Sequence, residues 1–321
     1  MAPSSPATPV SAIVLNYNRL SELRITLTDL SAQDYPALEV VVVDNASTDG
    51  SADMVRKEFP NVKLLVMPEN IGIQARRHAI DICSGTYLML YDDDCSPSTK
   101  SDVSRIAGFL DRRPEVSVLL TSVYRTRSDY YETWGLERFA VAGNAQDGYE
   151  GLYLFGAGTA YRKEHFLKTS AFSGEIFWGD EEFDAALSFI ANGYRLFYWP
   201  QVVTNHRASF VNRDVRKYYR RVTRNHLLTF CRYFDTPQVI EYSLKEFFYM
   251  SILARLAFPY VFLGVLDAFK GMGKARSQRR VIDKKFDLYI RNTVRGHRYP
   301  GPVKWLREQI ALKKNRKVKV F

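Results

Sequence analysis

Four strand-length apolar runs in the first hundred residues constrain the fold more than any other feature of the chain. They span residues 10–17, 38–44, 62–67 and 86–91, and are rich in valine, leucine and isoleucine. Helix-like patterns separate them, up to about residue 33 and over residues 51–59 and 71–83. Uninterrupted apolar strands that alternate with helices predict a parallel sheet covered on both faces. A further run at residues 116–123 predicts another strand.

Acidic side chains follow two of these runs where each run ends. Asp44 ends the second run, and Asp92, Asp93 and Asp94 follow the fourth. Because ligands of open parallel sheets bind beyond the carboxyl ends of the strands, we expect both groups at one ligand-binding edge. Adjacent carboxylates repel one another, and Mg²⁺ or Mn²⁺ held by oxygen ligands would offset that repulsion. The alternative reading is a solvated acidic turn before Pro97.

A second acidic group opens a helix that the sequence predicts from residue 181 to about Gly193. Four acids fall within residues 180–184, directly after the letters FWG. Asp180 suits an N-cap, and the helix dipole favours acids in the first turn, which together account for about two of the four. Glu181 and Asp184 fall near one another at helical spacing. A carboxylate at this position is placed to act as a general base.

Glycine-rich phosphate loops do not explain the acidic groups. The sequence contains no GxxxxGK[ST] run, and residues 156–161 (GAGTAY) lack the final glycine or alanine of a dinucleotide fingerprint. That segment also does not follow the first strand. An NAD-dependent enzyme and a P-loop NTPase are therefore both disfavoured.

Five short segments occur in an order typical of one enzyme family. They are residues 14–19 (VLNYNR), 41–51 (VVVDNASTDGS), 70–80 (NIGIQARRHAI), 85–97 (GTYLMLYDDDCSP) and 178–196 (WGDEEFDAALSFIANGYRL). On these segments the chain resembles the family 2 glycosyltransferases, in a rhamnosyltransferase-like bacterial branch, from about residue 10 to 235. The resemblance implies the GT-A fold, an α/β nucleotide-sugar-binding fold with a Rossmann-like, mostly parallel sheet.

The resemblance also implies roles for the first acidic group and its neighbours. Tyr17 and Asp44 would lie against the base of a nucleoside diphosphate. Arg76 would bind the nucleotide sugar near its base or phosphates. Asp92 and Asp94 match the family's metal-binding DxD motif. Asp93 lies between them and is expected to contact the nucleotide sugar together with Asp92.

The second acidic group matches the family's catalytic segment. Glu182 occupies the position of the catalytic base, where relatives carry the shorter aspartate, so Glu181 remains an alternative base. His206 matches a position where relatives often carry a histidine as a third metal ligand, although a loop residue is the alternative. Residues 155–162 resemble the floor of the sugar and acceptor site.

The resemblance implies an inverting, metal-dependent glycosyl transfer. Mn²⁺ or Mg²⁺ and Arg76 would neutralise the departing diphosphate while Glu182 takes the proton from an acceptor hydroxyl. The donor is expected to be a UDP- or dTDP-sugar. The expected acceptor is a lipid-linked glycan or a precursor of a cell-surface polysaccharide.

Two other functions fit parts of the sequence. A sugar-1-phosphate nucleotidyltransferase would carry a glycine-rich basic loop after the first strand, where this chain has LNYNRLSE. A non-catalytic nucleotide-sugar or nucleic-acid binding protein would show gaps in the acidic set, yet Asp44, Asp92, Asp94 and Glu182 are all present. Both readings are therefore disfavoured.

Charge divides the chain into two parts. Residues 211–321 hold 26 Lys and Arg against 8 Asp and Glu, a net of +18, whereas residues 1–210 hold 19 against 27, a net of −8. We expect a flexible leader at 1–9, a catalytic GT-A domain at 10–210 and a helical, basic region at 211–321. The basic region requires an anionic partner, and anionic lipid or nucleic acid would serve.

The apolar segment 247–269 favours the membrane among these partners. Its length is sufficient for a membrane span, but Arg255, Pro259 and the basic C-terminus oppose one. We expect one or two helices in the plane of an anionic membrane surface. Packing onto the catalytic domain, a homodimer contact and a true span are the alternatives, and nucleic acid is disfavoured.

The three cysteines indicate the compartment. Cys83, Cys95 and Cys231 are odd in number and share no metal-ligand spacing, which favours a reducing environment. Together with the basic, apolar segment, they predict a cytoplasmic protein at the inner face of the plasma membrane.

Overall fold

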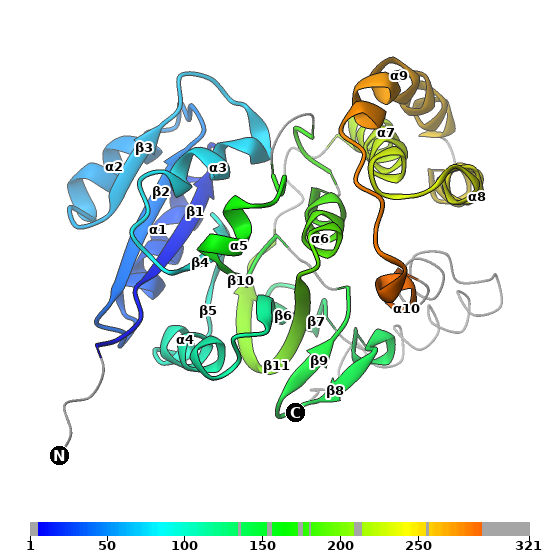
Figure 1. The fold of residues 1–321 in the computed structure, drawn as a ribbon. Helices are drawn as coiled ribbons and strands as arrows, with labels where there is room; N and C mark the ends of the chain where they lie inside the picture. Colours follow the sequence, from blue (N-terminus) through cyan, green and yellow to red (C-terminus); the bar gives the residue numbers. More distant parts are fainter. Residues whose placement is uncertain are drawn as a thin grey trace.

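The computed structural model describes residues 6–133, 136–152, 156–172, 176–179, 181–208, 214–254 and 257–290. Within these residues, one mixed sheet occupies the centre, and a group of long helices follows it in the chain (Figure 1). The α/β class predicted from the sequence is therefore confirmed.

The four apolar runs form the first half of the sheet. They are β1 (Val10–Asn16), β2 (Leu38–Asp44), β3 (Lys63–Val66) and β4 (Tyr87–Asp92). These strands pair in parallel in the order β3-β2-β1-β4. The register sets Asn16 opposite Asp44 and Leu15 opposite Asp92, so both aspartates end their strands at the same edge. We call this the acidic edge.

The second half of the sheet departs from the parallel pattern. A short strand, β10 (Thr159–Arg162), lies antiparallel between β4 and β6 (Val116–Arg125). The predicted strand at 116–123 is thus present but does not neighbour β4. With four residues, β10 is too short to stand out as a periodic pattern. Strand β11 (Arg195–His206) continues the sheet parallel to β6.

Short strands complete the sheet around β11 and β6. Strand β5 (Cys95–Pro97) pairs with β11 and sets Cys95 opposite His206. The others are β7 (Tyr130–Tyr131), β8 (Ala142–Asn144) and β9 (Gly148–Glu150).

Both faces of the sheet are buried, as continuous apolar strands require. Ile13 and Val41 belong to one hydrophobic cluster, whereas their neighbours Val14 and Val42 belong to another on the opposite face. The covering helices are α1 (Leu20–Ser31), α2 (Ser51–Glu58), α3 (Ala75–Ile80), α4 (Asp102–Arg112) and α5 (Lys163–Leu167), with 3₁₀ turns η1 (Gly72–Gln74) and η2 (Leu136–Phe139).

The second acidic group opens α6 (Glu181–Ala191), and three long helices follow β11. They are α7 (Val215–Tyr233), α8 (Thr236–Ala254) and α9 (Phe258–Ser277), followed by η4 (Lys284–Phe286) and α10 (Asp287–Ile290). Figure 1 shows α7, α8 and α9 on the side of α6 away from β1–β3.

The apolar segment 247–269 is divided between two helices. Pro259 lies in the first turn of α9, where its missing N–H group costs no helical hydrogen bond, so it starts a helix rather than kinking one. Arg255 lies outside the described residues. Within the described part of the chain, no helix has the length and apolar character needed to cross a membrane.

Gly72 makes a close backbone contact that generates a prediction. Its φ is +70°, and a Cβ there would lie 2.0 Å from the carbonyl oxygen of Phe177. We expect Gly72→Ala to lower the free energy of unfolding by at least about 2 kcal/mol, measured by urea denaturation. Gly273→Ala in α9 is the matched control, because nothing lies within 4 Å of its added methyl group. Equal effects of the two substitutions would contradict the prediction.

Candidate active site

The carboxylates of Asp92 and Glu182 both lie close to Gly156. A Cβ built on Gly156 would lie 2.7 Å from Oε1 of Glu182 and 3.7 Å from Oδ2 of Asp92. The end of β4 and the first turn of α6 therefore bring the two acidic groups of the sequence together. A side chain at position 156 would displace the Glu182 carboxylate, so glycine is required for this close approach. Phe155 and Asp180, which the sequence also placed here, lie outside the described residues.

Asp44 and Tyr17 differ in exposure. Asp44 is buried, and its carboxylate accepts hydrogen bonds from Nδ2 of Asn16 at 2.8 Å and from the Ser47 N–H at 3.0 Å. Tyr17 is exposed at the surface, and its backbone N–H donates to Asp93 at 3.3 Å. Asp44 thus fixes the loop that follows β2, whereas the Tyr17 side chain is open to a ligand.

Arg76 is fully buried with part of its donor capacity unused. Its Nη2 donates to the Asp92 carboxylate and, at 3.4 Å, to the carbonyl oxygen of Tyr91. Its Nε and Nη1 have no hydrogen-bond partner in the described part of the chain. The guanidinium also lies 5.7 Å from the ring centroid of Phe172. Because unpaired buried N–H groups of a cation are costly, this arrangement points to an anionic ligand.

Arg19 binds the remaining aspartates, and the sequence did not single it out. Its Nη1 donates to Asp94 and, at 3.3 Å, to Asp93. Burial raises the pKa of Asp93 to about 8, although the charge of Arg19 opposes that shift. Burial also raises the pKa of Asp94, but His206 and Arg19 outweigh it and leave the pKa lowered. The available signal was the position of Arg19 at the end of the segment 14–19.

Asp94, Cys95 and His206 form a candidate cation site. Their ligand atoms lie within 4.8 Å of one another, and Nε2 of His206 is 3.6 Å from Oδ1 of Asp94. Nδ1 of His206 bonds to Glu132, as in many metal sites where a carboxylate orients the histidine. Carboxylate and imidazole fit Mn²⁺. Burial raises the pKa of the Cys95 thiol well above its ordinary value, which makes it a poor ligand.

The expected metal-ligand set is therefore only partly assembled. The structure brings Asp94 and His206 together, but among the described residues the group does not include Asp92, which faces Arg76 and Glu182 instead. Burial lowers the pKa of His206, but the hydrogen bond to Glu132 and the charges of Glu132, Asp94 and Asp92 together outweigh burial, so the net shift of the pKa is upward.

Glu181 and Glu182 have different surroundings. Glu181 is buried, and its Oε2 accepts the N–H of Gly179 at 2.7 Å. Burial raises the pKa of Glu181 to about 7. Glu182 is partly exposed and lies against Gly156, close to Asp92. Of the two carboxylates that the sequence left open as the base, Glu182 is the more exposed.

Helix α7 supports the second acidic group. Asp184 accepts hydrogen bonds from Nη1 of Arg232 at 2.6 Å and from Oγ1 of Thr229 at 3.1 Å. Nδ2 of Asn225 donates to the carbonyl oxygen of Gly179 at 2.7 Å. The division of the chain at residue 210 stays a prediction, but the basic region supplies the side chains that hold the start of α6.

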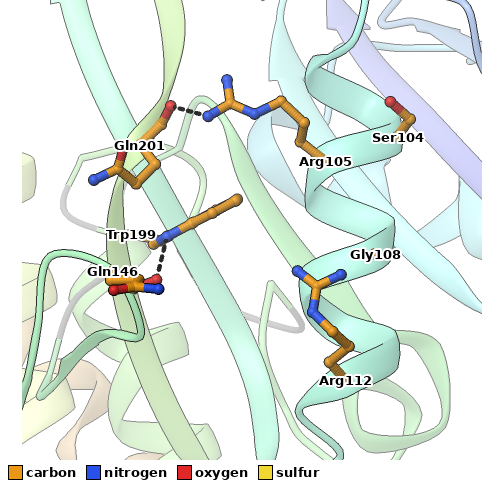
Figure 2. A pocket seen from close by; sticks show the side chains of 7 residues that line it. All are labelled: Ser104, Arg105, Gly108, Arg112, Gln146, Trp199 and Gln201. Carbon is orange, nitrogen blue, oxygen red and sulfur yellow. Dashed lines mark hydrogen bonds between the residues drawn. The ribbon is translucent and has the colours of Figure 1, made fainter.

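The cavity in Figure 2 lies elsewhere, between α4 and β11. It has a volume of about 550 Å³ and is lined by Ser104, Arg105, Gly108, Arg112, Gln146, Trp199 and Gln201. Trp199 is buried, with Phe109 at 4.6 Å and the guanidinium of Arg105 at 5.7 Å from its ring, so little of the ring is exposed for stacking on a ligand. No residue of the acidic edge lines this cavity.

The Arg232–Asp184 pair generates a second prediction. Both side chains are almost fully buried, so Arg232→Met leaves a buried charge without this partner. We expect the free energy of unfolding to fall by about 3–5 kcal/mol in urea titrations, and Asp184→Asn added to it to restore part of the loss. Arg24→Met, which breaks an exposed pair with Glu58, should cause no measurable change. Equal losses from both arginine variants would contradict the expectation.

Comparison with known proteins gives one family match. The family model described as Glycosyl transferase family 2 matches residues 11–169. The glycosyltransferase AglE of Haloferax volcanii is 35% identical over 108 residues, which are 31% of this chain and 36% of that protein. The teichuronic acid biosynthesis glycosyltransferase TuaG of Bacillus subtilis, a putative assignment in its own name, is 30% identical over 89 residues, 26% of this chain and 35% of TuaG. The matches thus span about a third of these relatives.

Solved structures resemble the fold over most of the chain. The mannosyltransferase PcManGT from Pyrobaculum calidifontis, in complex with GDP-Man and Mn²⁺, has a TM-score of 0.57 at 20% identity and covers 97% of this chain and 88% of its own. S. aureus TarS 1-349 in complex with UDP-GlcNAc has a TM-score of 0.57 at 16% identity, and the match covers 91% of this chain and 92% of the TarS chain. At such identities the likeness shows the fold alone, and that fold is GT-A, as the sequence predicts.

Proposed function

Because residues 11–169 match the model of glycosyl transferase family 2, we propose that this chain moves a sugar from a nucleoside-diphosphate sugar to an acceptor hydroxyl. The observation that carries the proposal is Arg76, a buried guanidinium with two unpaired donors beside the acidic edge. A donor diphosphate supplies the anionic oxygens that such a group requires.

The donor is proposed to bind across the acidic edge. Tyr17 and Asp44 lie on the side of the base, and Arg76 binds the diphosphate. Asp94 and His206 would hold Mn²⁺ or Mg²⁺, with Asp92 and Asp93 adjoining the nucleotide sugar. The bound cation would supply positive charge that stabilises the departing diphosphate. The presence of Mn²⁺ with PcManGT supports this proposal.

The transfer is proposed to invert the anomeric centre in one displacement. The acceptor oxygen forms its bond to the anomeric carbon while the bond from that carbon to the diphosphate oxygen breaks. Glu182 takes the proton of the acceptor hydroxyl, because it is partly exposed and lies beside Gly156, close to Asp92. Arg76 binds the negative charge that develops on the leaving diphosphate.

The substrates and the location of the chain are also proposals. UDP and dTDP sugars are the proposed donors, and the donors in related structures are UDP-GlcNAc and GDP-Man. A lipid-linked glycan or a polysaccharide precursor is the proposed acceptor, which the name of TuaG supports. The proposed location is the cytoplasmic face of a membrane, and a homodimer stays a prediction.

Nucleotide binding provides the first test of this function. We expect one of UDP, dTDP, GDP, CDP and ADP to raise the melting temperature, and to do so much more with Mn²⁺ present. At a hundredfold excess over Kd the stabilisation is about 2.7 kcal/mol. His206→Ala should remove the metal-dependent part, whereas His78→Ala, which changes an exposed histidine of α3, should retain it. If no nucleotide shifts the melting temperature, the donor site is wrong.

Replacing each glutamate separately tests the assignment of the base. We expect Glu182→Gln to lower kcat by about 10²–10⁴-fold while nucleotide binding is kept, because only the proton acceptor is lost. Glu181→Gln is the matched control and should remain active. A larger loss of kcat in Glu181→Gln than in Glu182→Gln would reverse the assignment.

The variant Glu181→Gln also tests a prediction about how stability depends on pH. The folded-state pKa of Glu181, about 7, lies above its ordinary value of 4.5, so ionising Glu181 destabilises the folded chain. The stability of the wild type therefore falls relative to Glu181→Gln as pH rises from about 4.5 to about 7, by up to about 3 kcal/mol, and the difference is constant above that. Urea denaturation at pH 4 and pH 8 would measure the difference, and a pH-independent difference would contradict it.

A further inference from the structure

Two rows of large apolar side chains lie exposed on α8 and α9. Each member is between 42% and 70% exposed, although side chains of this size are usually buried in a helix that packs on one face only. The α8 row consists of Ile240, Leu244, Phe248 and Ile252. The α9 row consists of Phe258, Phe262, Leu266 and Phe269.

The α8 row lies opposite the side of the helix that is buried. Its members repeat at every fourth residue, and the buried residues Tyr242, Met250 and Ala254 repeat with the same spacing, offset by two positions. An offset of two residues is about 200° around a helix, so the row faces outward.

The two rows join where α8 ends and α9 begins. The ring of Phe247 lies 6.0 Å from the ring of Phe248 and 6.0 Å from that of Phe258. Phe247 therefore connects the α8 row at Phe248 with the α9 row at Phe258, and we treat the two rows as one surface. We call it the α8–α9 surface.

Positive charge gathers at the end of α9, next to this surface. Lys270 directly follows Phe269, its side chain is 80% exposed, and its Nζ lies 3.6 Å from Oδ1 of Asp267. Lys274 and Arg276 lie in the last turn of α9. By sequence, residues 211–321 carry a net charge of +18, with 26 Lys and Arg against 8 Asp and Glu. An apolar surface with a cationic border is complementary to a bilayer with anionic headgroups.

We propose that the α8–α9 surface docks the chain on an anionic phospholipid bilayer, with the apolar rows inserted at the level of the headgroups. A second copy of the chain fits this surface less well, because two regions of net charge +18 would then lie against each other. An anionic bilayer instead gains about 1 kcal/mol from each lysine or arginine near the surface.

Aromatic contacts connect the α8–α9 surface to the candidate active site. The guanidinium of Arg216 lies 5.8 Å from the ring centroid of Tyr260 in the first turns of α9. On the same helix as Arg216, Tyr218 packs against Trp178 with 5.8 Å between the rings, and Trp178 precedes Glu181 closely in the chain. This step rests on the proposed function: a docked bilayer would present a lipid-linked acceptor near the first turn of α6.

Vesicle co-sedimentation of the full chain tests the docking surface. The probes are vesicles of phosphatidylcholine alone and of phosphatidylcholine mixed with phosphatidylglycerol. We expect binding to the anionic vesicles, weakened by added salt because exposed charges are screened. The double variant Phe248→Ser/Phe262→Ser should bind at least about tenfold more weakly. Leu167→Ser, which replaces an equally exposed leucine of α5, should bind like the wild type.

Three results would overturn the docking surface. They are no binding of the wild type to anionic vesicles, equal binding of the double variant, and a dimer in sedimentation velocity that the double variant dissociates without any vesicle binding. Nucleotide stabilisation, measured on the same samples, shows that each variant is folded. Vesicle binding without stabilisation by any nucleotide would reject the proposed function and keep the docking surface. Stabilisation by a nucleotide without vesicle binding would reject the docking surface and keep the proposed function.

Discussion

Carboxylates gathered at one edge of the sheet, with Asp44 and Asp94 buried and Asp92 partly exposed, are the constraint on which the rest of this structure depends. The register of β1 with β2 and β4 brings Asp44 and Asp92 to one edge, and the turn after β4 adds Asp94. Like charges so close and so poorly solvated would oppose folding unless cations share the space. Arg76 and Arg19 meet that need from opposite sides, the first at Asp92 and the second at Asp94.

The basic region is joined to this edge through α7. Arg232 holds Asp184, and Asn225 holds the carbonyl oxygen of Gly179, so the turn that presents Glu181 is fixed by a helix from beyond β11. Helices α8 and α9 pack on α7 in turn. Side chains from both sides of the charge boundary in the sequence therefore contribute to the start of α6.

Local sequence patterns sufficed to predict those features of the fold and the site that are determined by residues close together in the chain. The four strands, the acids at their ends and the start of α6 each follow from a short run of letters. The antiparallel strand at 159–162 and the pairing of Cys95 opposite His206 depend on register between distant segments, which a single sequence does not encode locally. Arg19 was missed for the same reason, since only the folded chain brings it to Asp94.

The two carboxylate oxygens of Asp94 have different partners. Its Oδ2 accepts from Arg19, whereas its Oδ1 faces Nε2 of His206 at 3.6 Å. A cation bound between Asp94 and His206 would therefore use the oxygen that Arg19 leaves, and Arg19 would orient the ligand rather than compete with the cation. Since Arg76 holds Asp92 in the same way, each arginine fixes one aspartate of the DxD motif. Two guanidinium groups and one divalent cation, together +4, would balance the four aspartates Asp44, Asp92, Asp93 and Asp94, so that the proposed anionic donor would meet less repulsion at the acidic edge.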